Sequence, residues 1–203
     1  WKEVCNIVYN SKSHFIFLNF KILFSTITKA TSINFFISEL IKKHKLQTTS
    51  LCLYSYWWLE ESIGVSYFKY YNSNVKAITR CHGYDLYSER WKGNYLPLKK
   101  FSLENLDGIF SISKNGISYI KKKYFINETL GAKLKLGRLG VINGERRLLE
   151  FKNNDVFTIV SCCQVYPNKR IHLLIDAILK LDFKVKWVHL GSYIPNFSEN
   201  YYN

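Results

Sequence analysis

The chain has 203 residues, of which 29 are basic and 15 acidic, giving a formal net charge of +14. A chain of this length can bury a sizeable core in one large domain or two small ones. Its five cysteines lack a Cys-x-x-Cys spacing, which argues against a zinc site and a disulfide framework and favours a reducing cytoplasm. The positive charge attracts nucleic acid, anionic lipid and phosphorylated small molecules, so it narrows the class of partner without naming one.

Residues 16–36 form the first long apolar stretch. They are rich in Phe, Leu and Ile, but Lys21 and Lys29 interrupt them, whereas a membrane span needs about 20 mostly apolar residues. Two interpretations of this amphipathic segment stay open. Its apolar side chains pack on the sheet of the first domain, which we favour, or lie with flanking lysines on a membrane surface. The side chains concerned are Phe17, Phe20, Ile22, Leu23 and Phe24.

Apolar strand patterns alternate with helical patterns along the chain, which is typical of a doubly wound α/β sheet. Residues 143–154 are polar and form the predicted hinge. This hinge separates a first domain, residues 1–150, from a second, residues 151–203. The predicted strands begin near Leu51, Val75, Leu106, Val156 and Val185.

Most clusters of basic residues are interpreted as solvated faces. Residues 121–123 are three lysines near the end of a predicted helix that Ser113 can cap. Cations at that position complement the negative end of the helix dipole, so they need no ligand to explain them. The apolar stripe of this helix is Ile117, Ile120 and Tyr124.

The first candidate site follows the strand at residues 77–79. The strand ends beside His82, Gly83 and Asp85, which places an imidazole and a carboxylate at the carboxyl edge of a sheet. Ligands of open α/β folds bind at that edge. A capped loop would also explain a His-Gly turn with a nearby Asp. We expect Asp85 to fix the turn and its hydrogen bonds rather than to act as a nucleophile.

The second candidate site follows the strand that begins at Val156. A short loop containing Pro167 leads into a predicted helix, and Lys169 and Arg170 fall in its first turn. Cations are unfavourable at that end of a helix, so this pair predicts an anion such as phosphate. A solvated Lys-Arg pair is the alternative. The apolar face of the predicted helix is Ile171, Leu174, Ile175, Ile178 and Leu179.

The strand at residues 186–190 carries His189 and is followed by Gly191 and Ser192. We interpret His189 as a structural residue near a cleft rather than as an acid or base. Gly191 is typical of a point where the backbone approaches a nucleotide closely.

Taken in order, several blocks of this sequence resemble the family-four retaining glycosyltransferases of the GT-B fold, and most closely the bacterial enzymes that build surface polysaccharides. The resemblance runs from about Leu51 to Ser192. The matching blocks are RCHGYDLYSER, YLPLKK, LDGIFSISKNGISYI, LGRLGV, TIVSCCQVYPNKRIHLLIDAI and VKWVHLGS.

The resemblance implies a role for each block. His82 would lie against the donor sugar, between two Rossmann-like domains, with Gly83, Asp85 and Gly191 supporting the cleft. Lys169 would contact the donor diphosphate, with Arg170 beside it, and neither a metal nor another cofactor is expected.

The partners that the resemblance implies are a nucleotide-sugar donor and a glycan or lipid-linked acceptor, with no nucleic acid. Peripheral contact with an anionic membrane, at the inner face of a cytoplasmic location, is a further expectation.

The sequence departs from the family in ways that limit this inference. Where many members carry an Arg after the first strand of the second domain, residues 161–163 are Ser-Cys-Cys. The family's Glu-x7-Glu element and the Gly-rich loop near the amino terminus have no counterpart. With no methionine present, we expect the chain to be a piece of a longer enzyme that is inactive by itself. An inactive remnant of a truncated gene and a basic nucleic-acid-binding domain are the alternatives.

Overall fold

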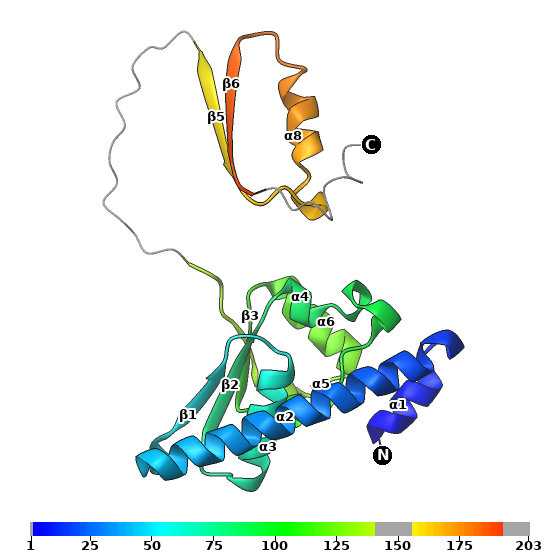
Figure 1. Ribbon diagram of the computed structural model, residues 1–203, viewed down its shortest axis with the longest axis vertical. Helices are drawn as coiled ribbons and strands as arrows, with labels where there is room; N and C mark the ends of the chain where they lie inside the picture. The colour runs from blue at the N-terminus through cyan, green and yellow to red at the C-terminus, as the bar shows by residue number, and fades with distance from the viewer. Residues whose placement is uncertain (1, 141–155, 193–203) are drawn as a thin grey trace. The chain divides into compact units, whose positions relative to one another are not determined.

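The computed structural model describes residues 2–140 and 156–192 (Figure 1). The chain divides into two compact units, Trp1–Val141 and Ile142–Asn203, and each is described by itself. The predicted hinge at residues 143–154 and the predicted boundary at residue 150 lie outside the described residues.

The first unit is built on a parallel four-stranded sheet in the order β1-β2-β3-β4. Ser55 of β1 pairs with Thr79 of β2, and Cys81 of β2 pairs with Ser111 of β3, so these strands end at one edge. This arrangement confirms the predicted α/β class, and it is compatible with a Rossmann-like fold. The strands are β1 (Cys52–Ser55), β2 (Lys76–Cys81), β3 (Gly108–Ser111) and β4 (Leu134–Leu136).

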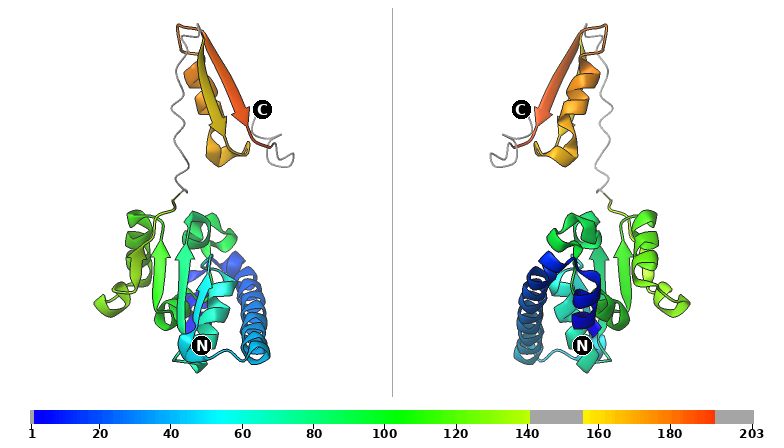
Figure 2. Two further views of the ribbon diagram at one scale, coloured as in Figure 1. Left: turned by 90° about the vertical axis from the view of Figure 1, so that its left-hand side faces the viewer. Right: turned by 90° about the vertical axis from the view of Figure 1, so that its right-hand side faces the viewer.

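Helices cover both faces of this sheet (Figure 2). The predicted cap of α6 is confirmed, because the Ser113 hydroxyl accepts a hydrogen bond from the Gly116 N–H at 3.0 Å. The core between the layers contains Trp58, Leu103, Leu106 and Ile109, each 0–1 % exposed. The helices that follow β1 are α3 (Glu60–Tyr71), α4 (Gly83–Leu86), α5 (Lys99–Asn105), α6 (Lys114–Tyr124) and α7 (Glu128–Gly131).

Two helices precede the sheet, α1 (Lys2–Asn10) and α2 (Ile16–His44). The 29 residues of α2 run along the outside of the unit and pack on α3 (Figure 1). The two helices approach closely at Gly64, where an added Cβ would lie 2.7 Å from the Ile33 side chain and 2.9 Å from the Ala30 carbonyl oxygen. Glycine is therefore required at this crossing.

The favoured interpretation of the α2 side chains is wrong for two phenylalanines. Phe17 and Phe24 are 82 % and 77 % exposed, because the helical period turns them to the outer face. Leu23 is buried, but it packs with Ile7 and Tyr95 in a small second cluster instead of on the sheet. The side chains of α2 do not reach the sheet because α2 packs on α3, and α3 in turn packs on β1 and β2. No described helix is long and apolar enough to cross a membrane.

The described part of the second unit is one β-α-β motif: β5 (Phe157–Cys162), α8 (Ile171–Ile178) and β6 (Val185–Leu190). The two strands are parallel and in register from Phe157 and Val185 to Cys162 and Leu190. Among residues 156–192, Ile171 is the single buried hydrophobic residue.

The predicted start of this helix is wrong. Lys169 closes a 3-10 turn, Pro167–Lys169, and Arg170 caps α8 with a left-handed φ of 54°. A residue in that conformation cannot continue a right-handed helix, so both cations precede α8 instead of occupying its first turn. The helix also ends before Leu179, which is 77 % exposed and so does not join the packed face.

Candidate functional site

Three aromatic side chains meet where β1 and β2 end. Tyr56 and Trp57 follow β1, and His82 follows β2. The imidazole ring of His82 lies 4.8 Å from the Tyr56 ring and 4.4 Å from the Trp57 ring, measured between centroids. Parallel pairing of the strands brings these positions together, because the residues after their carboxyl ends share one edge of the sheet.

His82 is buried, and its imidazole has no hydrogen-bond partner among the described residues. Both of its ring nitrogens are covered. The nearest carboxylate oxygen, Oδ2 of Asp85, is 3.9 Å from Nδ1, which is too long for a hydrogen bond. Since buried polar groups are almost always paired, this imidazole is the clearest candidate for contact with a ligand.

Asp85 holds the backbone around His82. Its fully buried carboxylate accepts hydrogen bonds from the backbone N–H of His82 at 2.6 Å and from the backbone N–H of Trp58 at 2.6 Å. One side chain thus ties the end of β2 to the loop after β1, as expected of a residue that fixes the turn. The adjacent Gly83 leaves room for Arg90, whose guanidinium would lie 2.9 Å from an added Cβ.

Lys99 supports the same two loops from α5. Its buried ammonium donates to the backbone carbonyls of Trp58 and Asp85, the latter at 2.8 Å, and lies 4.5 Å from the centroid of the Trp58 ring. Burial lowers the pKa of Lys99 to about 7, although the Asp85 charge opposes the shift. Burial and the Asp85 charge likewise raise the pKa of the Cys81 thiol to about 12.

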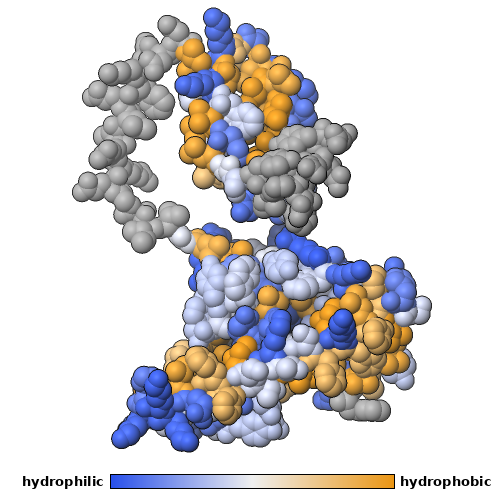
Figure 3. All heavy atoms as spheres, in the orientation of Figure 1, coloured by the Kyte–Doolittle hydropathy of each residue, from blue (hydrophilic) through white to orange (hydrophobic). Residues whose placement is uncertain are grey.

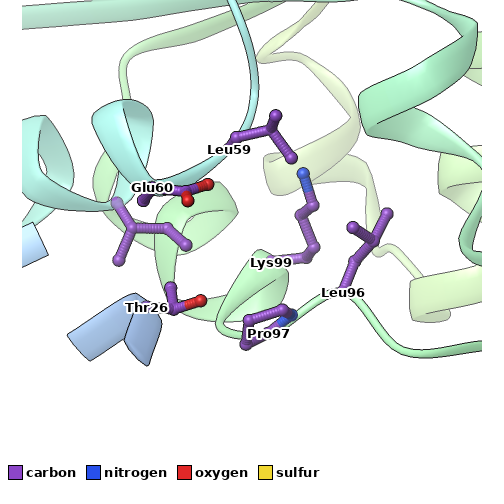
Figure 4. A pocket seen from close by; sticks show the side chains of 7 residues that line it. Thr26, Leu59, Glu60, Leu96, Pro97 and Lys99 are labelled. Carbon is purple, nitrogen blue, oxygen red and sulfur yellow. The ribbon is translucent and has the colours of Figure 1, made fainter. Parts of the chain in front are cut away.

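A groove begins beside these loops. The Lys99 side chain extends toward Leu59 in a small pocket of about 20 Å³ (Figure 4). That pocket shares Leu59, Glu60 and Leu96 with a larger groove of about 370 Å³ between α2 and residues 91–97. The two hollows therefore lie side by side at the start of α3.

The second unit positions the remaining predicted residues. Backbone hydrogen bonds hold the exposed Lys169 and Arg170 in their turn, from Lys169 N–H to the Tyr166 carbonyl at 2.8 Å and from Arg170 N–H to the Pro167 carbonyl at 3.1 Å. Lys169 and Arg170 are thus neighbours after β5, at the carboxyl end of that strand.

Gly191 has a structural reason to be glycine. An added Cβ would lie 1.7 Å from the Cys163 carbonyl oxygen, so the close approach here is between two backbone segments. His189 lies beside it, and its Nδ1 is 2.8 Å from the Ser161 hydroxyl. The same hydroxyl accepts a hydrogen bond from the Trp187 indole at 2.9 Å, which places His189 in a structural network.

The structure thus brings His82, Gly83 and Asp85 together in the first unit. In the second unit Lys169 and Arg170 are neighbours, and Gly191 packs against Cys163. Sequence reasoning missed the aromatic pair at residues 56–57, the buried Lys99 and the groove. The tandem tryptophans at residues 57–58, just after a strand, could have signalled the aromatic pair. The burial of Lys99 depends on tertiary packing, which no local pattern predicts.

A search for metal-binding groups and two comparisons with known proteins were applied to this site. Within residues 2–140 and 156–192, no group of three or more His, Cys, Asp or Glu side chains could hold a metal ion. Comparison of the chain with protein-family models and with curated proteins finds no match.

Proposed function

We propose that this protein is a retaining glycosyltransferase of the GT-B type that moves a sugar from a nucleotide-sugar donor to a surface glycan or its lipid-linked precursor. The observation that carries the proposal is His82, a buried imidazole without a hydrogen-bond partner in the described chain, at the carboxyl end of a central parallel strand. The ordered sequence blocks that resemble family-four enzymes support it.

In this proposal His82 positions the donor sugar by a hydrogen bond. The bond is made by a ring nitrogen that has no partner in the described chain. Asp85 and Lys99 do not touch the substrate. They hold the loops on either side, so that the imidazole keeps its place against the rings of Tyr56 and Trp57. A group held in this way contributes through orientation and hydrogen bonding to the transition state.

Lys169 and Arg170 hold the diphosphate of the donor. Two adjacent cations in an exposed turn can neutralise the negative charge that develops on the leaving group, which is electrostatic stabilisation of the transition state. The family's acidic Glu-x7-Glu element, which would hold the ribose and sugar, has no counterpart in residues 1–203. The proposal therefore requires other groups to hold the ribose and sugar.

The test is sugar transfer by the protein expressed with its flanking coding sequence. His82→Ala should lower turnover by at least about 100-fold, the usual scale for a positioned catalytic group. His44→Ala, an exposed histidine at the end of α2, is the matched control and should leave turnover unchanged. Unchanged turnover of His82→Ala with an unchanged melting temperature would make His82 a structural residue and overturn the proposal.

Calorimetry with a nucleoside diphosphate tests the phosphate site separately. Lys169→Ala should cost about 1.5–3 kcal/mol of binding free energy, because a charge-assisted hydrogen bond is lost. Lys122→Ala removes an exposed lysine of α6 and should change the affinity little. Equal, small effects of the two substitutions would remove Lys169 from the donor site.

A further inference from the structure

Two arginines flank His82 in the chain. Arg80 precedes it in β2, and Arg90 follows it after α4. Neither guanidinium forms a salt bridge within residues 2–140 and 156–192. Since a guanidinium carries five N–H donors in a planar fork, each of the two can bind an oxyanion.

Arg80 shares one side of its strand with His82. The backbone of His82 continues the extended conformation of β2, with φ of −121° and ψ of −174°. Side chains two residues apart in such a strand lie on the same face, with Cα atoms about 7 Å apart. The Nε of Arg80 is covered by protein, yet it has no hydrogen-bond partner among the described residues. A buried donor in this state is rare, and it marks a place where a ligand can bind.

The lack of a side chain at Gly83 makes room for Arg90. A Cβ built at Gly83 would have Nη1, Cζ and Nη2 of Arg90 as its nearest neighbours, at 2.9, 3.4 and 3.6 Å. Gly83 does not have a positive φ, so its backbone conformation does not by itself require glycine. The guanidinium of Arg90 therefore lies against the residue that is bonded to His82.

Contacts within the segment after α4 hold Arg90 in this position. Its guanidinium carbon lies 5.2 Å from the centroid of the Tyr87 ring, a cation–π contact. Its backbone N–H donates to the Tyr87 carbonyl at 3.1 Å. The neighbouring Trp91 indole donates to the Tyr84 carbonyl at 2.8 Å. The cation is thus positioned before any ligand binds, which reduces the entropy cost of binding.

The acidic side chains of the same segment are already engaged. The Asp85 carboxylate accepts two backbone N–H groups. Glu89 accepts a hydrogen bond from the Tyr119 hydroxyl at 2.8 Å and pairs with Lys123 at 3.8 Å. Figure 3 shows hydrophilic residues over α4 and the segment that follows it. The positive charge of the two arginines therefore remains available for a ligand.

From this geometry we infer that the donor sugar carries a carboxylate, as a hexuronic acid does, and that Arg90 and Arg80 bind it. The inference rests on the proposed function, in which His82 contacts the sugar and cations of the second unit hold the diphosphate. An oxyanion beside His82 then belongs to the sugar. A guanidinium matches a carboxylate with two parallel hydrogen bonds, which distinguishes a hexuronate from a neutral hexose.

NMR titration of the 203-residue protein with simple glycosides tests the carboxylate, because it detects the weak binding expected of single sugars. Methyl glucuronide and methyl galacturonide are compared with methyl glucoside and methyl galactoside, which carry a hydroxymethyl group in place of the carboxylate. We expect at least one uronide to bind at least about tenfold more tightly than its neutral partner. If neither uronide does so, the inference is overturned.

Substitutions test the residues. Arg90→Gln should weaken the uronide about tenfold. Gly83→Ala should have a similar effect, because the added methyl group displaces the guanidinium and meets no other atom as closely. Lys92→Gln removes an exposed cation of the same segment and is the matched control, with unchanged affinity expected. Unchanged affinity of Arg90→Gln would remove Arg90 from the site and overturn the inference.

Inorganic pyrophosphate, titrated into the same variants, distinguishes the two possible sources of the oxyanion. Arg90→Gln and Arg80→Gln should leave pyrophosphate binding unchanged. If they weaken pyrophosphate and not the uronide, the arginines serve the diphosphate of the donor, and the carboxylate is overturned.

Sugar transfer separates this inference from the proposed function. The protein expressed with its flanking coding sequence is offered nucleotide-activated hexuronates and the corresponding neutral hexoses. Transfer of a hexuronate that Arg90→Gln lowers at least about tenfold supports both. Transfer of neutral hexoses alone overturns the carboxylate and leaves the glycosyltransferase standing. Uronide binding without transfer from any donor overturns the glycosyltransferase and leaves the carboxylate site standing.

Discussion

The strands β2 and β5 both end in a cysteine and both lead to predicted site residues, yet their surroundings differ. Cys81, at the end of β2, is fully buried, whereas Cys162, at the end of β5, is exposed. β2 pairs with strands on both sides, but within residues 156–192 β5 pairs with β6 alone. A similar local pattern therefore makes a strand in both units, and the neighbouring elements decide whether its end becomes a buried site.

This difference extends through the two units. The first has a continuous core from Ile37 to Leu134 that includes the fully buried Trp58. The described part of the second leaves Phe157 and Val160 each 62 % exposed. The loops around His82 are consequently held by packed side chains, whereas the turn at Lys169 is held by backbone hydrogen bonds.

The strongest test of this contrast compares two tryptophans. Trp58→Ala should reduce the free energy of unfolding of the first unit by about 3–5 kcal/mol, because a large buried side chain is lost. It also removes a hydrogen bond of 2.6 Å to Ser102. Trp187→Ala, in the second unit, should leave that unfolding transition unchanged. Urea unfolding followed by circular dichroism measures both, and equal shifts would show that the two units do not unfold independently.

The next test concerns two glycines. Gly191→Ala forces a methyl group against the Cys163 carbonyl and should destabilise the β5-β6 pair by about 1–3 kcal/mol. Gly140→Ala meets no atom within 4 Å and is the control. Faster hydrogen exchange at the Cys163 amide, which donates to Leu190 at 3.0 Å, would report the effect. Unchanged exchange would mean that the second unit accommodates the methyl group by moving.

A smaller effect is expected from the titration of Lys99. The folded pKa of about 7 lies below the ordinary lysine value of 10.5, so between these pH values the unfolded chain binds more protons than the folded one. Stability should therefore rise with pH above about 7, by at most about 1.4 kcal/mol per pH unit. Lys99→Met should lack this rise between pH 7 and 9. Parallel pH profiles of the two proteins would contradict the lowered pKa.

The last test perturbs no interaction and measures reactivity. Cys81 has a raised pKa of about 12 and is buried, so alkylation by iodoacetamide at pH 8 should be at least about 100-fold slower than at Cys162. Peptide mass spectrometry at increasing times gives both rates. Similar rates would show that the end of β2 opens readily, and would weaken the case for a preorganised His82.

Much of the first unit was predictable from local patterns. The strands after residues 51, 75 and 106 were found because each is a short apolar run, and the start of α6 was found because Ser113 is a good cap. The short strand β4, Leu134–Leu136, was missed, since an alternation over three residues, Leu-Lys-Leu, is too short to predict a strand.

The site was predictable only where one chain segment determines it. His82, Gly83 and Asp85 are neighbours in sequence, so their clustering follows from the turn. The contact of His82 with Trp57 and the burial of Lys99 depend on strand order and on the packing of α5. The error at Lys169 and Arg170 has another cause: the left-handed conformation of Arg170 is unusual for a residue other than glycine, and no residue pattern signals it.

The close crossing of α2 and α3 has a consequence for how this sequence can diverge. Because the space at Gly64 is filled by Ile33 and by the Ala30 carbonyl, a larger side chain there must push α2 away from α3. The groove wall from Leu18 to Lys29 belongs to the same rigid helix, so it would move as well. Chains that keep this groove should therefore keep a small residue at the crossing, even though it lies outside the groove.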